Sequence, residues 1–231
     1  MNEKKDDLFS GLYHTPELAA YLASLTSADE GYASHVTAAM AKAGVSGSAV
    51  SPAEGRILET LARLSGARKA VEVGSLYGYS AHWLARGLAD GARLYSLEKD
   101  PACVNAAKDA VEASCLSRKV TVMEGPAADS LKTLSKLAPF DLCFIDADAE
   151  SYPAYLRWAA ANLRPGGLVV AARAFFRGGM HAVGGAPAET AGARAMREFF
   201  HILFDSDRFV STAVLPTPEG LALGLKAPEN A

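Results

Sequence analysis

The chain has 231 residues and a formal net charge of −3, and half of its residues are hydrophobic. A chain of this length can bury a core without disulfide or metal staples, and it fits one α/β domain. It carries no basic stripe of the kind that nucleic-acid binding requires. No apolar run approaches the roughly 18 residues of a membrane span, and the first residues lack the apolar core of a signal peptide. We therefore expect a cytoplasmic protein that binds neither nucleic acid nor membrane.

The three cysteines are widely spaced, at Cys103, Cys115 and Cys143. They match no zinc-ligand pattern and cannot all pair with one another. Cys143 lies in an apolar run, so core packing is the expected role there. The sequence predicts reduced structural thiols.

The chain divides into an N-terminal helical segment, 1–48, and a larger region, 49–231. Within the first segment we predict helices over 16–25 and 32–43. A small, Gly/Ser-rich loop covers 43–52.

From residue 52 onward, predicted helices and strands alternate along the chain. Ser51 is a good N-cap and Pro52 suits a first helical turn. The predicted helices span 52–65, 78–89, 101–113, 127–137, 153–163 and 192–205. The predicted strands span 69–73, 93–98, 119–124, 140–146, 168–172, 209–216 and 220–226. A turn is expected at Pro165-Gly166-Gly167, and a long Gly-rich loop at 178–192. Alternation of this kind implies a mostly parallel sheet covered by helices, and the final hairpin implies one antiparallel strand.

The loop after the first predicted strand is the first candidate ligand site. Ligands of open α/β sheets bind at the carboxyl ends of the strands, where this chain has Glu72, then Gly74, Gly78 and Ser80. Glycines let the backbone approach a ligand, and the following helix offers amide groups that suit a carboxylate. The Gly74–Gly78 spacing is not the G-x-G-x-x-G of dinucleotide binders.

Polar and small residues follow the next strands at the same edge. Glu98 ends the second strand, 24 residues after Gly74 (98 − 74). A carboxylate there can accept both hydroxyls of a ribose; the alternative is a solvated charge at a strand end. Gly125-Pro126-Ala127 forms a bend where backbone groups can meet an adenine ring. Asp146 and Asp148 place acids beside the same cleft.

Five segments together resemble the small-molecule O-methyltransferases of the caffeoyl-CoA and catechol type: VEVGSLYGYS, SLEKDP, EGPA, FDLCFIDAD and LRPGG. The resemblance runs from Val50 to Lys226. It implies an S-adenosylmethionine (SAM)-binding, Rossmann-like class I methyltransferase domain over 49–231. The sheet would have seven strands, the last of them antiparallel, with helices on both faces and N-terminal helices in addition.

The resemblance also assigns roles to residues. SAM would be the methyl donor, a small molecule the acceptor and S-adenosylhomocysteine (SAH) the product. The donor would be lined by the matching positions Val50, Glu72, Gly74, Ser75, Tyr79, Ser80, Glu98, Pro126, Ala127 and Asp146. Because family members are often dimers that use their N-terminal helices, we expect a homodimer. The segment 1–48 would then serve the substrate and the dimer, with residues 8–25 at the interface.

The chain departs from the family at the metal site. The usual mechanism holds a divalent ion with three oxygen-bearing ligands. Asp146 would be the first, but Ala172 and Arg173 stand where an Asp-Asn pair is usual, and Ala149 stands where a lysine base is usual. We therefore expect a metal-independent O-methyltransferase acting on a phenol or carboxylate. Arg173 would replace the cation and hold an anionic oxygen; the alternative is that Arg173 faces a local acid such as Asp148.

Other assignments stay open from the sequence. The proposed catalytic set is Asp146, Arg173 and His181, the last as a replacement base in the Gly-rich loop; a solvated loop histidine is the alternative. A catalytically inactive SAM-binding sensor or partner protein is a second hypothesis. A nicotinamide-dependent oxidoreductase is a third, against which the glycine spacing argues.

Overall fold

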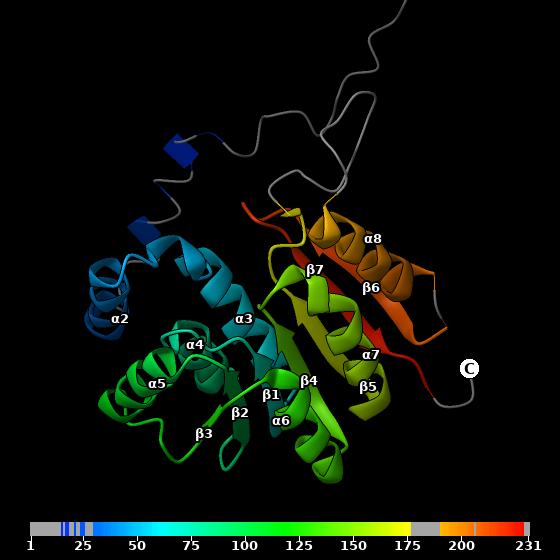
Figure 1. Ribbon diagram of the computed structural model, residues 1–231, viewed down its shortest axis with the longest axis horizontal. Helices are drawn as coiled ribbons and strands as arrows, with labels where there is room; N and C mark the ends of the chain where they lie inside the picture. The colour runs from blue at the N-terminus through cyan, green and yellow to red at the C-terminus, as the bar shows by residue number, and fades with distance from the viewer. Residues whose placement is uncertain are drawn as a thin grey trace, which may run out of the picture.

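A seven-stranded sheet carries the fold, in the order β3-β2-β1-β4-β5-β7-β6 (Figure 1). The computed structural model describes residues 15, 17–18, 21, 24–25, 30–176, 190–205 and 207–228. The strands are β1 (Lys69–Val73), β2 (Arg93–Glu98), β3 (Val120–Glu124), β4 (Phe140–Ile145), β5 (Leu163–Ala171), β6 (Phe209–Leu215) and β7 (Leu221–Lys226).

The strand directions confirm the predicted fold class. Strands β1 to β5 pair in parallel, and β7 pairs antiparallel with both β5 and β6. The chain builds β1, β2 and β3 outward to one edge and then returns to place β4 on the other side of β1. The strand order therefore reverses between β1 and β4, which is where ligands of such sheets bind.

Helices cover both faces of the sheet. They are α2 (Glu30–Lys42), α3 (Pro52–Leu64), α4 (Tyr79–Gly87), α5 (Pro101–Ala113), α6 (Ala127–Leu134), α7 (Tyr152–Asn162) and α8 (Ala191–Phe204). Short 3-10 turns lie at η2 (Ser46–Ser48), η3 (Ser135–Leu137) and η4 (Ala149–Ser151). Local signals explain two of the starts. Ser51 and Glu54 form a reciprocal capping box at α3, and the Asp100 carboxylate caps α5.

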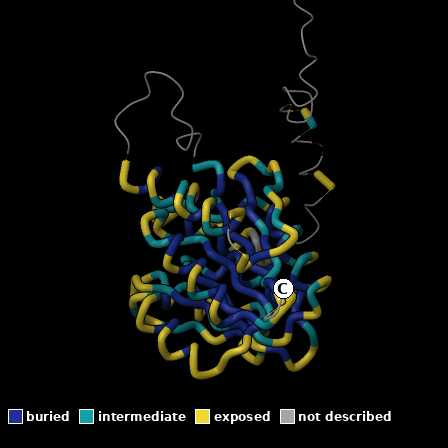
Figure 2. The backbone as a smooth tube through the Cα atoms, turned by 90° about the vertical axis from the view of Figure 1, so that its right-hand side faces the viewer, coloured by how far each residue is buried: buried dark blue, intermediate teal, exposed yellow. Residues whose placement is uncertain are grey.

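The two faces of the sheet are buried in separate cores. Ala70 of β1 and Leu142 of β4 pack with α3, α4 and α5. The next residue of each strand, Val71 and Cys143, packs with α6, α7 and α8. This alternation follows from the period of two along a strand, and strands buried on both faces are apolar throughout. Figure 2 shows the buried backbone in the interior, with exposed residues at the outside.

The N-terminal region is described in part. Helix α2 covers most of the predicted 32–43 helix, and its Val36 and Met40 are buried in the same core as α3. Most of the predicted 16–25 helix lies outside the described residues. The division of the chain at residues 48 and 49 therefore stays a prediction.

Strand β5 begins earlier than the sequence indicates. The Pro-Gly-Gly segment predicts a turn at 165–167, but the strand already starts at Leu163 and runs through this segment. The register with β4 shifts between Phe140 and Leu142, and Gly166 has a φ of +69°. An irregularity of this kind admits glycine and proline into a strand, so the turn prediction was wrong.

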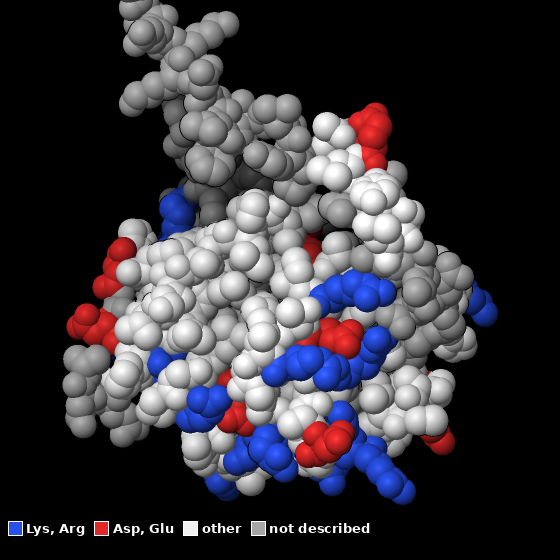
Figure 3. Space-filling view, turned by 180° about the vertical axis from the view of Figure 1, so that it is seen from behind, with Lys and Arg blue, Asp and Glu red and all other residues white. Residues whose placement is uncertain are grey.

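Within the described part of the chain, no helix is long and apolar enough to cross a membrane. The face seen from behind carries acidic side chains among its basic ones (Figure 3). The absence of a nucleic-acid partner stays a prediction.

Gly55 sets the spacing between α3 and α4. A Cβ built there would lie 2.4 Å from Nε1 of Trp83, whose side chain is buried. We expect Gly55→Ala to lower the free energy of unfolding by about 1–3 kcal/mol, the usual range for overpacking a core. Gly47→Ala is the matched control, because a Cβ at Gly47 meets nothing within 4 Å. Urea denaturation of both variants tests this; equal losses would contradict it.

Candidate functional site

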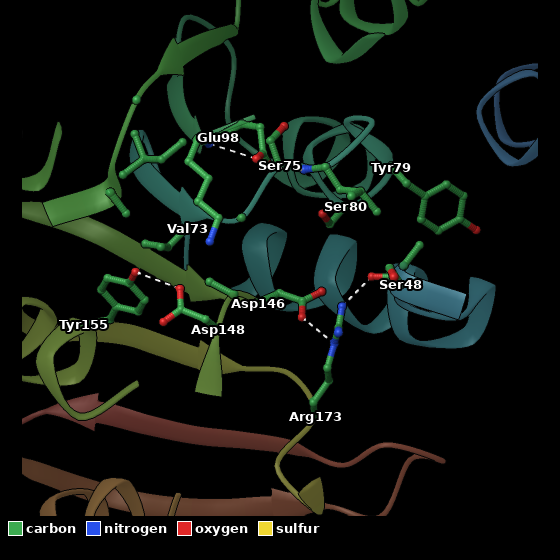
Figure 4. Close-up of a pocket in the computed structure, with 18 residues that line it drawn as sticks. Ser48, Val73, Ser75, Tyr79, Ser80, Glu98, Asp146, Asp148, Tyr155 and Arg173 are labelled. Carbon is green, nitrogen blue, oxygen red and sulfur yellow. Dashed lines mark hydrogen bonds and ion pairs between the residues drawn. The ribbon is translucent and has the colours of Figure 1, made fainter. Parts of the chain in front are cut away.

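A cavity of about 220 Å³ opens at the carboxyl ends of β1, β2 and β4 (Figure 4). The predicted site residues that line it are Gly74, Ser75, Tyr79, Ser80, Glu98, Ala127, Asp146 and Arg173. The other lining residues are Ser48, Ala49, Val73, Leu76, Leu97, Lys99, Gly125, Ala147, Asp148 and Tyr155. Glu98 and Arg173 lie toward opposite ends of the group drawn in Figure 4.

Gly74 brings the first loop against the end of β4. Its φ is +96°, and a Cβ there would lie 2.0 Å from the carbonyl oxygen of Asp146. The amides of Gly74 and Ser75 both donate to the carbonyl of Leu97 at 3.0 Å. Only glycine combines this backbone conformation with so close an approach. The glycine therefore joins the ends of β1, β2 and β4 into one floor for the cavity.

Glu98 is held by backbone amides on both sides of its carboxylate. The amide of Leu76 donates to Oε2 at 2.8 Å, and the amides of Lys99 and Asp100 donate to Oε1 at 2.8 and 2.9 Å. These contacts fix the carboxylate at the edge of the cavity. Each oxygen keeps further acceptor capacity, so Glu98 can accept the two hydroxyls of a ribose.

The β1–α4 loop offers polar groups to the same cavity. The Ser75 hydroxyl is buried and has no hydrogen-bond partner among the described residues. A buried hydroxyl without a partner is costly, and a bound ligand would satisfy it. Helix α4 begins at Tyr79, and its first turn lines the cavity through Tyr79 and Ser80. Its positive dipole end and first amides suit a carboxylate.

Glu72 lies behind this loop and does not line the cavity. It is completely buried in β1, and the Ser96 hydroxyl donates to its Oε2 at 2.5 Å. Burial raises the pKa of Glu72 to about 7; hydrogen bonds from Ser80 and Ser96 oppose that rise, and the charges of Asp146 and Glu98 add to it. Ser80, which interacts with the Glu72 carboxyl, lines the cavity.

Arg173 forms an ion pair with Asp146 at one end of the cavity. Its Nε lies 2.8 Å from Oδ1 of Asp146, and its Nη2 donates to the carbonyl of Ser48. The arginine therefore faces Asp146 and not Asp148, whose carboxylate accepts from Ser151 and Tyr155. Burial raises the pKa of Asp146 to about 6, although the Arg173 charge pulls it downward.

Two glutamates that the sequence reading missed border the same end. A second, smaller cavity of about 30 Å³ is lined by Gly47, Ala49, Val50, Glu54, Ala172, Arg173 and Glu219. Glu54 is 3% exposed, and its Oε1 accepts from the Thr217 hydroxyl at 2.7 Å. The capping box marks Glu54 in the sequence, but nothing local indicates that the turn before β7 reaches it.

The remaining predicted site residues lie elsewhere. Val50 lines the smaller cavity, and Pro126 precedes α6 without lining either cavity. His181 lies outside the described residues, so its assignment as a base stays a prediction.

The residues at the end of β5 do not suit a divalent cation. Ala172 has no ligand atom, and the guanidinium of Arg173 takes the charge of Asp146. In the described part of the chain, no group of three or more His, Cys, Asp or Glu side chains is arranged to hold an ion. The family mechanism uses three oxygen ligands, and the residues present here do not supply them.

Comparisons with known proteins agree with this geometry. A family model described as O-methyltransferase matches residues 24–227. The catechol O-methyltransferase of Mycobacterium tuberculosis is 34% identical over 199 residues, which is 86% of this chain and 88% of that protein. That of Niastella koreensis is 37% identical over 153 residues, 65% of this chain and 69% of that protein. This chain therefore belongs to the O-methyltransferase family.

Solved structures place ligands in relatives of the same fold. The O-methyltransferase of Bacillus cereus, in complex with SAH, is 30% identical with a TM-score of 0.79, and the match covers 85% of this chain and 91% of that one. TomG of Streptomyces achromogenes, in complex with SAM and involved in tomaymycin synthesis, is 28% identical with a TM-score of 0.83. That match covers 92% of this chain and 96% of that one.

The buried Glu72 predicts how stability depends on pH. Its pKa is higher in the folded chain, about 7, than the ordinary value of 4.5. Between these values the folded state binds more protons, so stability falls as pH rises through the window. We expect Glu72→Gln to flatten this dependence by roughly 2–3 kcal/mol. Urea unfolding of both proteins at pH 5, 6, 7 and 8 measures it, and parallel curves would show that Glu72 does not titrate there.

Proposed function

We propose that this chain transfers the methyl group of SAM to an oxygen of a small-molecule acceptor, without a divalent metal. One cavity carries the proposal: the fixed carboxylate of Glu98 stands at one end and the Arg173–Asp146 ion pair at the other. The Glu98 carboxylate suits the ribose of the donor, and the Arg173 guanidinium takes the place of a metal cation beside the acceptor. The two SAM- or SAH-bound relatives support the choice of donor.

The donor end fits SAM group by group. Glu98 would accept the ribose hydroxyls, and Gly125 and Ala127 would border the adenine. The first turn of α4 and the Ser75 hydroxyl would hold the methionine carboxylate. Bound SAM supplies a methyl carbon that is electrophilic because it is attached to a sulfonium. The protein's part is to orient that carbon toward the acceptor end and to exclude water.

The acceptor end suits an oxygen that is already anionic. The Arg173 guanidinium has five N–H groups and its side chain is 38% exposed, so donors remain beyond those used by Asp146 and Ser48. A phenolate or carboxylate held there needs little help from a base. Because Glu54 and Glu219 border the same region, we expect a single anionic oxygen and not a polyanion.

An inactive SAM-binding sensor is the second candidate, because the lysine of the family is Ala149 here. Turnover of SAM with any acceptor would identify an active methyltransferase, because an inactive sensor binds SAM without consuming it. The homodimer and the cytoplasmic location stay predictions alongside both.

The donor site is tested by calorimetric titration of SAH in excess EDTA. We expect micromolar binding by the wild-type chain, and at least tenfold weaker binding by Glu98→Gln, since hydrogen bonds to a charged group contribute about 1.5–3 kcal/mol. Glu124→Gln is the matched control, because Glu124 ends the neighbouring strand beside Glu98 but does not line the cavity. An absence of binding with and without magnesium contradicts the proposed function.

The metal-free acceptor site is tested by restoring the family's ligand pair. We expect the double variant Ala172→Asp/Arg173→Asn to gain Mn²⁺ binding, because it adds two oxygen ligands beside Asp146 and removes the guanidinium. Ala172→Asp alone keeps Arg173 and should not gain it. Electron paramagnetic resonance of free Mn²⁺ measures the difference. Equal Mn²⁺ affinity in the wild-type chain and the double variant would show that an ion site already exists.

The variant Arg173→Ala tests whether the guanidinium contributes to methyl transfer. With benzoate and an acidic phenol such as 4-nitrophenol as acceptor probes in EDTA, turnover of SAM should fall at least tenfold in this variant while SAH affinity changes little. Unchanged turnover would mean that Arg173 does not contact the acceptor.

A further inference from the structure

Glu72 is a buried carboxylate without a counter-charge. It lies in β1, an inner strand between β2 and β4, and no Lys, Arg or His of the described residues forms an ion pair with it. Its Oε1 is buried and has no hydrogen-bond partner there. An unpaired buried charge is strongly unfavourable. An apolar side chain at this position would give a more stable fold, so we expect a functional reason for the carboxyl group.

The surroundings of Glu72 are negative as well. Asp146 and Glu98 both act on it electrostatically, and both line the cavity. Arg173 pairs with Asp146, and Lys99 is a further cation of the cavity lining; neither forms an ion pair with Glu72. Ser80 links Glu72 to the cavity, because its hydroxyl interacts with the carboxyl and the residue also lines the cavity.

The two ligands of the proposed reaction differ by one charge. SAM carries a sulfonium, and SAH carries a neutral thioether after the methyl group has left. Coulomb attraction across a few ångströms of protein is worth far more than in water. A carboxylate behind the β1–α4 loop can therefore distinguish the two ligands although their shapes are nearly the same.

We propose that Glu72 is a positioning residue that acts through Ser80: it shifts the donor site toward the cationic SAM relative to SAH, and SAM binding releases the proton of its carboxyl to solvent. The inference rests on the proposed function. It assigns to this residue a selectivity between donor and product, in addition to its place beside the donor.

The direction of the pH effect follows from linkage. In the free chain burial holds the pKa of Glu72 near 7, and a nearby cation favours the charged form and lowers that pKa. Below pH 7, SAM binding must therefore expel a proton, so SAM affinity falls as pH falls. SAH lacks the sulfonium charge, so its affinity falls less. The ratio of SAM to SAH affinity consequently decreases from pH 7.5 to pH 6.

The test is calorimetric titration of SAM and SAH into the full chain at pH 6, 6.5, 7 and 7.5. At pH 6.5 it is repeated in phosphate and in imidazole, whose different ionisation heats reveal proton release. For the wild-type chain we expect SAM affinity to fall roughly fivefold over this range, with a smaller fall for SAH and a net proton release with SAM. Glu72→Gln should show a clearly smaller release and a weaker pH dependence of the affinity ratio, which leaves only the contribution of Asp146, whose pKa of about 6 lies at the lower end of this range.

Ser96→Ala keeps the carboxyl and removes a hydroxyl that stabilises its charged form. Ser96 does not line the cavity, so a purely structural role predicts no change in the pH profile. We expect its profile to move to higher pH, and that of Glu124→Gln to match the wild type. Equal pH profiles for SAM and SAH in the wild-type chain, or no shift in Ser96→Ala, overturn the inference and leave the proposed function standing. Failure of both ligands to bind overturns both.

Discussion

The candidate site depends on one close contact, between Gly74 of the β1–α4 loop and the end of β4. Gly74 must approach the Asp146 carbonyl more closely than any side chain allows, and the same residue ties the loop to Leu97 of β2. Three strand ends therefore meet with almost no freedom between them. Glu98 and Asp146 are fixed at a set separation by backbone geometry, and the positions of both ligands in the proposed reaction follow from it.

Local chemistry predicted most of the framework. Ser51 and Asp100 predicted the starts of two helices, because a side-chain oxygen at the N-cap accepts hydrogen bonds from the first helical amides. The apolar runs predicted the buried strands. The start of β5 was missed because Pro165 and the glycines after it act as turn residues unless a neighbouring strand tolerates an irregular register. Periodicity carries no information on that tolerance.

The candidate site was predictable only where a motif carries its residues. Glu98 and the β1–α4 loop are continuous with strands, so their place at the sheet edge follows from topology. The partner of Arg173 could not be predicted from the sequence, since Asp146 and Asp148 are similarly distant from it along the chain. Glu54 and Thr217 are 163 positions apart, and a contact of that kind leaves no local trace.

The backbone at Arg173 is left-handed, with a φ of +52°. Such a conformation is strained for an arginine by about 1–3 kcal/mol, and it suits asparagine or glycine far better. The fold thus still offers the geometry that an amide-bearing residue prefers, while the side chain supplies a charge instead. A substitution of Arg173 by asparagine or glycine would relieve this backbone strain. An arginine that persists in descendants of this chain would record selection for its charge, because backbone preference alone would remove it.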